Sequence, residues 1–271
     1  MAALLRGAAA LPRQLWVYRE FVIANVRREI AGRYAGTLLG GVWSLLQPLA
    51  MILIYTVVFS RVMHARLGSS DLPYAYSIFL CAGMLPWVLF VESVGRTTSV
   101  FLDYGNLIKK VQFPKVCLPA IALLSAGFNF AAAFAIFLVF LTAMGAFPGW
   151  LLLPLAAVLA VQLALSAGLG VMLGTLNVFF RDVGQITSVG LQFWFWLTPI
   201  VYPPTIVPPW MQRGLRFNPM APIVAAYQQI LVYGTLPDPV TLLYPAALAL
   251  LLSALGYRLF RAHAGEMADE M

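Results

Sequence analysis

The chain has 271 residues, of which 62% are hydrophobic and only 10% are charged, and its formal net charge is +7. Soluble domains are about 45–50% apolar and about 25% charged. A chain this apolar cannot cover a water-facing surface, which excludes a soluble globular protein and makes the lipid bilayer part of its solvent.

Long runs without charged residues predict the membrane spans, because the hydrocarbon core requires about 20 apolar helical residues. The run 34–60 has 27 such residues. The run 116–180 has 65, which is enough for two helices separated by a turn at 147–150. Together the runs predict six transmembrane helices, at about 38–60, 73–100, 115–145, 151–180, 184–202 and 239–259.

The segment 203–227, between the fifth and sixth predicted spans, cannot continue as a regular helix. Proline removes a helical hydrogen bond and clashes with the preceding turn, and this segment contains Pro203, Pro204, Pro208, Pro209, Pro219 and Pro222. Irregular backbone at membrane depth must be surrounded by protein or line a water-filled cavity. We therefore predict a re-entrant or interfacial element here, within an all-α membrane protein that forms one transmembrane domain over residues 1–271.

The basic residues predict the orientation, because cytoplasmic loops carry an excess of Lys and Arg. In the six-span arrangement, the side with both termini carries 13 of the 17 basic residues. If 217–237 also crossed the bilayer, the division would be 11 against 6. We therefore predict a multi-pass protein with both termini in the cytoplasm, and we attribute the positive charge to topology rather than to binding of nucleic acid.

Residues 13–31 have the pattern of an amphipathic helix. Apolar residues at 15, 18, 22, 26 and 30 recur at helical spacing, and basic residues occupy other faces. The pattern fits a helix that contacts membrane lipid in the cytoplasmic headgroup layer, and a soluble helix against another subunit is the alternative. The residues that we single out are Arg13, Trp16, Arg19, Arg27 and Arg28.

The predicted cytoplasmic loop 103–115 joins two long spans and mixes lysines with apolar residues. Retention in the cytoplasm requires only the lysines. The apolar residues have the spacing of a short helix with an apolar face, which indicates either docking of another protein or burial at the membrane interface. The candidate residues are Leu107, Ile108, Lys109, Lys110, Val111, Phe113 and Pro114.

Four consecutive aromatic residues, 193–196, lead into a Thr-Pro segment. Consecutive residues face all sides of a helix, so some of these rings point away from lipid. Aromatic faces stack on sugar rings, while packing or an interfacial belt is the alternative for any single ring. The candidates for a substrate path are Phe193, Trp194, Phe195, Trp196 and Tyr202.

The sequence shows no catalytic apparatus. A phosphate-binding loop, a nucleophile elbow and a zinc-protease motif are all absent, so we predict no catalytic, cofactor-binding or metal-ligating residue. Glu92 and Arg96 have the four-residue spacing of a helical ion pair, and we predict a structural role for them. Glu92 is also the one candidate for proton coupling within the spans, so a separate ATPase is the simplest energy source.

Several short motifs occur in order along almost the whole chain. They are RYAGTLLG at 33–40 with Trp43 and Gln47-Pro48, GMLPW at 83–87, LIKKVQFP at 107–114, Leu118-Pro119, NVFFRDV at 177–183, TPIVYP at 198–203 and NPM at 218–220. In this ordered set the chain resembles the membrane-spanning permease subunits of bacterial ABC polysaccharide exporters, the type 2 exporters that move lipid-linked O-antigen or teichoic acid.

The resemblance implies a homodimer that encloses a continuous channel and carries two cytoplasmic ABC ATPase subunits, which use ATP and Mg²⁺. It implies that 103–115 is the ATPase-coupling loop, that 13–31 is an interface helix, and that 203–227 forms short re-entrant helices near the outer mouth. It further implies a location in the bacterial inner membrane. The patterns at 109–110 and 177–182 are closer to O-antigen and teichoic-acid exporters than to capsule exporters.

Two other functions are open at this point. A membrane enzyme acting on polyprenyl-linked sugars requires membrane-proximal carboxylates for metal–diphosphate chemistry, whereas the acidic residues here are scattered singly. A permease for drugs or other lipids would share both the topology and the energy source.

Overall fold

The computed structural model describes residues 13–33, 36, 42–58, 75–111, 113–204, 207–268 and 270. Within these ranges the regular elements are helices, and no strand occurs. The predicted all-α class is therefore confirmed for the described part of the chain.

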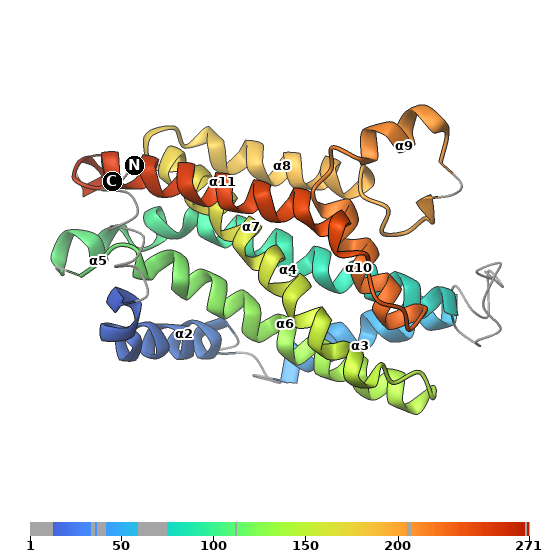
Figure 1. The fold of residues 1–271 in the computed structure, drawn as a ribbon. Coiled ribbons are helices and arrows are strands. Elements are labelled where there is room, and N and C mark those ends of the chain that lie inside the picture. The colour runs from blue at the N-terminus through green and yellow to red at the C-terminus, as the bar shows by residue number, and fades with distance from the viewer. Residues whose placement is uncertain are drawn as a thin grey trace.

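Four helices in the described ranges are long and apolar enough to cross a bilayer. They are α4 (Ala75–Asp103), α6 (Cys117–Ala143), α7 (Leu152–Phe179, preceded by the 3₁₀ turn η3, Gly149–Leu151) and α11 (Pro239–His263). They lie side by side as a bundle (Figure 1) and occupy four of the six positions where the uncharged runs predict spans.

The other two predicted spans correspond to shorter helices. Helix α3 (Trp43–Tyr55) continues as a π-helical turn to residue 58, and part of its predicted range, 38–60, lies outside the described residues. Helix α8 (Asp182–Trp196) has 15 residues and ends six residues before the predicted end of the span 184–202. Its end has a local cause, because a residue that precedes proline, here Thr198, is disfavoured in helical geometry.

Short helices complete both ends of the bundle. Helix α9 (Pro209–Leu215) and helix α10 (Met220–Val232) follow the proline-rich segment. Helix α2 (Arg19–Arg33), helix α5 (Gly105–Lys110) and the 3₁₀ turn η5 (Glu266–Ala268) lie at the other end (Figure 1). The Lys115 ammonium donates a hydrogen bond to the Ala264 carbonyl, so the end of α11 lies at the same end of the molecule as α5.

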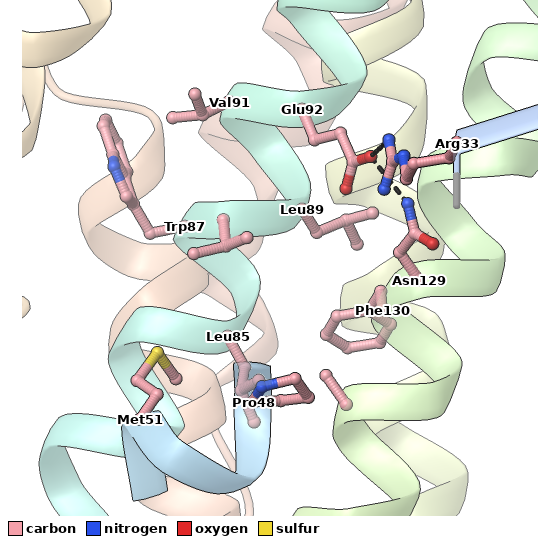
Figure 2. A pocket seen from close by; sticks show the side chains of 12 residues that line it. Arg33, Pro48, Met51, Leu85, Trp87, Leu89, Val91, Glu92, Asn129 and Phe130 are labelled. Atoms are coloured by element: carbon pink, nitrogen blue, oxygen red, sulfur yellow. Dashed lines mark hydrogen bonds and ion pairs between the residues drawn. The ribbon is translucent and has the colours of Figure 1, made fainter. Parts of the chain in front are cut away.

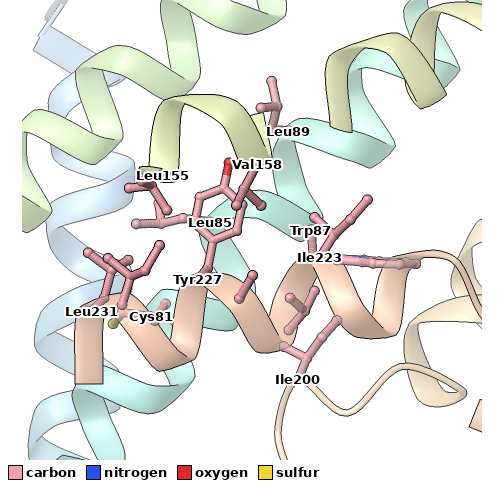
Figure 3. Packing of buried hydrophobic residues seen from close by; sticks show 14 of the residues in the cluster. Cys81, Leu85, Trp87, Leu89, Leu155, Val158, Ile200, Ile223, Tyr227 and Leu231 are labelled. Carbon is pink, nitrogen blue, oxygen red and sulfur yellow. The ribbon is translucent and has the colours of Figure 1, made fainter. Parts of the chain in front are cut away.

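Helix α10 is buried although it is only 13 residues long. Its Tyr227 is 1% exposed and packs, with Ile223 and Leu231, against residues of α4 and α7 (Figure 3). At 1.5 Å per residue the helix is about 20 Å long, which is shorter than the hydrocarbon core. Its apolar surface is covered by the bundle.

Helix α7 lies at the centre of the fold and approaches α11 closely at two glycines. A Cβ atom at Gly168 would lie 2.5 Å from the Ser253 backbone nitrogen, and a Cβ atom at Gly256 would lie 2.8 Å from the Gly168 carbonyl oxygen. Small residues allow helix backbones to approach in membranes, where van der Waals contact and interhelical hydrogen bonds hold helices together. The two glycines therefore set the α7–α11 distance.

We predict that Gly168→Ala lowers stability by about 1–3 kcal/mol, because the added methyl group meets backbone that cannot move aside. Thermal unfolding of the purified protein in detergent measures the effect. Gly127→Ala in α6 is the matched control, since a Cβ atom there meets nothing within 4 Å. Equal melting temperatures for the two variants would contradict the close-approach argument.

Candidate functional site

The end of the bundle that contains α5 presents a basic and partly apolar surface. Lys109, Lys110 and Val111 are exposed, whereas Ile108 is buried and Leu107 is half-buried. The short helix predicted within 103–115 is therefore present, but its predicted apolar face is only partly inward, because Val111 is 46% exposed. Burial, and secondarily the charge of Asp103, raises the pKa of the Tyr104 hydroxyl, so this group stays neutral beside the lysines.

A compact apolar cluster holds this surface in place. Phe113 and Pro114 are half-buried, and the Phe113 ring lies 5.1 Å from the Phe21 ring of α2. Met267 of η5 is fully buried in the same cluster as Ile108. We call this end of the molecule, formed by α5, residues 113–116, η5 and the first half of α2, the docking end.

Helix α2 packs against the bundle with three residues of the predicted apolar face, whereas Tyr18 of that face lies in a turn before α2 and is exposed. Val22 is buried and Val26 and Ile30 are half-buried. On the outer side Trp16 is 70% exposed and the Arg19 guanidinium stacks 5.0 Å from the centre of its ring. The five basic and aromatic residues singled out from the sequence are all exposed, namely Arg13, Trp16, Arg19, Arg27 and Arg28.

A cluster of charged side chains joins α2 to α4. Glu92 and Arg96 lie 2.9 Å apart, and Glu92 also lies 2.7 Å from Arg33 of α2. Arg96 in turn pairs with Glu29 of α2. We call these four residues, in the spatial order Glu29–Arg96–Glu92–Arg33, the ion ladder. Sequence analysis identified only its α4 half, although Glu29 and Arg33 have the same four-residue spacing as Glu92 and Arg96.

The ion ladder borders a cavity of about 580 Å³ between α3, α4 and α6. Arg33, Glu92 and Asn129 meet at one corner of this cavity, and the rest of its wall is mostly apolar, including Met51 and Phe130 (Figure 2). The charged groups at this corner therefore pair with one another.

A groove of about 660 Å³ lies between α4 and α8. Trp87, Phe195 and Trp196 supply aromatic surface to it. Small and polar side chains supply the rest, including Ser99, Thr187, Ser188 and Gln192. Aromatic faces combined with hydroxyl and amide groups form a surface that suits sugar rings.

The aromatic run divides between the core and the exterior. Phe193 and Trp196 are 69% and 64% exposed, whereas Trp194 and Phe195 are half-buried. The Trp194 ring packs edge-on against Phe90 at 5.3 Å. The Tyr202 hydroxyl donates to the Trp196 carbonyl at 2.9 Å, which folds the chain after α8 back onto its end.

Asn218 connects the end of α8 to the start of α10, and sequence analysis gave it no role beyond the motif that contains it. Its Oδ1 accepts hydrogen bonds from the Trp194 indole at 2.8 Å and from the Met220 backbone at 3.0 Å. Its Nδ2 donates to the Leu197 carbonyl and to the Thr198 hydroxyl, both at 2.9 Å. One buried amide thus satisfies the polar groups where the helical hydrogen bonds stop.

Asn177 has a similar role at the turn between α7 and α8. Its Nδ2 donates to the Thr98 carbonyl of α4 at 3.0 Å, and its Oδ1 accepts from the Gly184 backbone at 2.8 Å. The adjacent Arg181 and Asp182 are exposed. The turn is therefore fixed by the amide of Asn177, which the sequence analysis did not separate from its charged neighbours.

Within the described residues, no group of three or more His, Cys, Asp or Glu side chains has the arrangement of a metal site.

Comparisons with known proteins point to transport. Residues 20–232 match the family described as ABC-2 type transporter. The chain is 32% identical to the O-antigen export system permease protein RfbA of Myxococcus xanthus, over 96% of this chain and 99% of that protein. It is 27% identical to RfbA of Klebsiella pneumoniae, over 89% and 91% of the two chains. It is 24% identical to the polysialic acid transport protein KpsM of Escherichia coli, over 90% and 94%.

We predict that Asn218→Ala lowers the free energy of unfolding by about 1–3 kcal/mol, because it leaves the Trp194 indole and the Leu197 carbonyl without this hydrogen-bond partner in a buried site. Thermal unfolding followed by tryptophan fluorescence measures the loss. The control is Gln229→Ala, a half-buried amide of α10. A loss no greater than in the control would show that Asn218 does not hold this junction.

Proposed function

The chain belongs to the ABC-2 type transporter family, and we propose that it is the membrane-spanning permease subunit of an ATP-driven exporter of lipid-linked polysaccharide. The observation that carries the proposal is the similarity to O-antigen export permeases over nearly the full length of both chains. O-antigen is the substrate that we propose first, with teichoic acid as the related class.

The groove between α4 and α8 supports a glycan as cargo. A sugar ring has apolar C–H faces and a rim of hydroxyl groups, so aromatic faces and hydrogen-bonding groups can contact it without ion pairs. Trp196 and the half-buried Phe195 provide aromatic faces, and Ser188 and Gln192 provide hydrogen-bonding groups. We propose that this groove, together with Phe193, Trp194 and Tyr202, forms part of the path.

The proposed complex is a homodimer of this subunit with two cytoplasmic ABC ATPase subunits, which bind ATP and Mg²⁺. The docking end is the surface that we assign to the ATPase. Lys109, Lys110 and Val111 are exposed there and combine positive charge with an apolar side chain. We assign Arg13, Trp16, Arg19, Arg27 and Arg28 to an interface helix at the same membrane surface, where Arg and Trp favour the headgroup layer.

In the bacterial inner membrane, the docking end then faces the cytoplasm, and both termini lie on that side. We propose six spans, with α3 and α8 as the first and fifth. Helices α9 and α10 form re-entrant helices at the outer mouth. The burial of the short helix α10 by α4 and α7 supports this assignment, since non-spanning backbone at membrane depth must be covered by protein.

We predict that replacing Lys109, Lys110 and Phe113 together with alanine abolishes export while membrane insertion survives. The change removes charge and an aromatic contact from the docking end, so the ATPase loses its attachment. Glycan export in cells that lack the native permease measures transport, and co-purification of the ATPase measures docking.

The matched control is the triple variant in which Arg213, Arg216 and Phe217 are replaced by alanine. It likewise removes two basic side chains and one phenylalanine, but at the opposite end of the bundle. The ATPase should co-purify with this control as well as with the unchanged protein. ATP-dependent export that persists in the variant of 109, 110 and 113 would refute the coupling assignment.

We predict that Ser188→Trp lowers glycan export by about tenfold or more, which corresponds to about 1.4 kcal/mol, because the indole fills the groove. Ser188→Ala is the control, since it leaves the groove open. ATP hydrolysis by the assembled complex should continue in both variants. Normal export by Ser188→Trp would place the path elsewhere.

A further inference from the structure

Two helices form the ion ladder, and each supplies two charged residues that lie four positions apart. Helix α2 supplies Glu29 and Arg33, and helix α4 supplies Glu92 and Arg96. Residues four apart lie on one face of a helix, so each helix turns a single face toward the cluster. Negative and positive side chains alternate along the ion ladder. Each of its two central members, Arg96 and Glu92, therefore has an oppositely charged partner on both sides.

Helix α6 adds a third pair with this spacing, which is uncharged. The Ser125 hydroxyl donates to Glu29 at 2.9 Å, and the Asn129 amide donates to Glu92 at 2.7 Å. Each carboxylate of the ion ladder therefore accepts from α6 as well as from an arginine. The four charges of the ion ladder sum to zero, and Ser125 and Asn129 tie its two carboxylates to α6.

The alternating order fixes the register of α2 against α4. A shift of α2 by one turn would bring Arg33 to the position of Glu29, beside Arg96, and like charges would then meet. The four ionic side chains are between 19% and 33% exposed, so solvent screens them only in part. An apolar contact would tolerate such sliding, whereas this arrangement opposes it.

The first half of the same helix belongs to the docking end. Val22 is buried in the cluster that contains Ile108, and Phe21 contacts Phe113. Helix α2 thus joins the docking end to the long helices α4 and α6. We infer that the ion ladder makes α2, α4 and α6 one rigid unit, with Arg96 as the positioning residue that transmits movement of the docking end to α4 and its groove. The part of the inference that concerns transmission of movement to the groove rests on the proposed function.

The rigid unit can be tested without transport. Spin labels at Ile23 of α2 and Leu124 of α6, both exposed, report the distance between these helices in lipid nanodiscs. The native Cys81 and Cys117 are buried, so labels enter only at introduced cysteines. We expect one narrow distance distribution that is the same with and without ATP in the assembled complex. A distribution that shifts with ATP would overturn the rigid unit.

Charge-neutral double variants separate a linking role from simple charge balance. Glu29→Gln combined with Arg96→Gln leaves no net charge but breaks one of the two ionic links between α2 and α4. We expect a broader distance distribution and an export rate lower by about tenfold, with ATP hydrolysis retained. Arg33→Gln combined with Glu92→Gln should behave in the same way. The control is Arg258→Gln combined with Glu270→Gln, an equal charge change at exposed positions.

The single variants complete the test. If the ion ladder served only to balance charge, the single variant Arg96→Gln would be impaired, whereas the neutral double variant would show normal export and a narrow distance distribution. That result would overturn the inference. If the unchanged chain binds no ATPase or exports no glycan, the proposed function fails. The comparison of distance distributions between unchanged and double-variant chains requires neither activity, and it still decides whether the ion ladder holds α2 against α6.

Discussion

The absence of water from the hydrocarbon core is the constraint on which the rest of this structure depends. Each polar group placed there must find its partner within the protein. Helices satisfy their own backbone, and the exceptions are the points where helices start, stop or carry charge. At these points specific side chains supply the missing partners. Asn177 does so before α8 and Asn218 after it, and oppositely charged side chains pair between α2 and α4.

The same constraint explains how the helices pack. Lipid is as apolar as leucine, so apolar side chains alone give little preference for one neighbour over another. Close backbone approach at Gly168 and Gly256, and polar contacts that have only one satisfied geometry, supply that preference. The groove between α4 and α8 is bordered by helices fixed in this way, because Asn177 bonds to both of them.

The sequence predicts the all-α class, the four long helices and the short helix within 103–115. These features follow from uncharged runs and apolar spacing, which directly reflect how the chain is solvated. The end of α8 was predicted too late, because hydropathy does not register the effect of Pro199 on Thr198. Arg33 and Asn129 were not identified as partners of Glu92, nor Glu29 as the partner of Arg96, since contacts between residues 37 to 67 positions apart depend on tertiary packing. Asn218 and Asn177 lay within the motifs, but only geometry separates them from their neighbours.

The burial of Met267 beside Ile108 has a consequence for biosynthesis. The contact between Lys115 and Ala264 spans 149 positions of the chain, so α5 leaves the ribosome long before the segment that covers it. Until residues 264–268 arrive, the underside of α5 lacks part of its apolar contact. The apolar underside of α5 is therefore completed only after α11 has been synthesised.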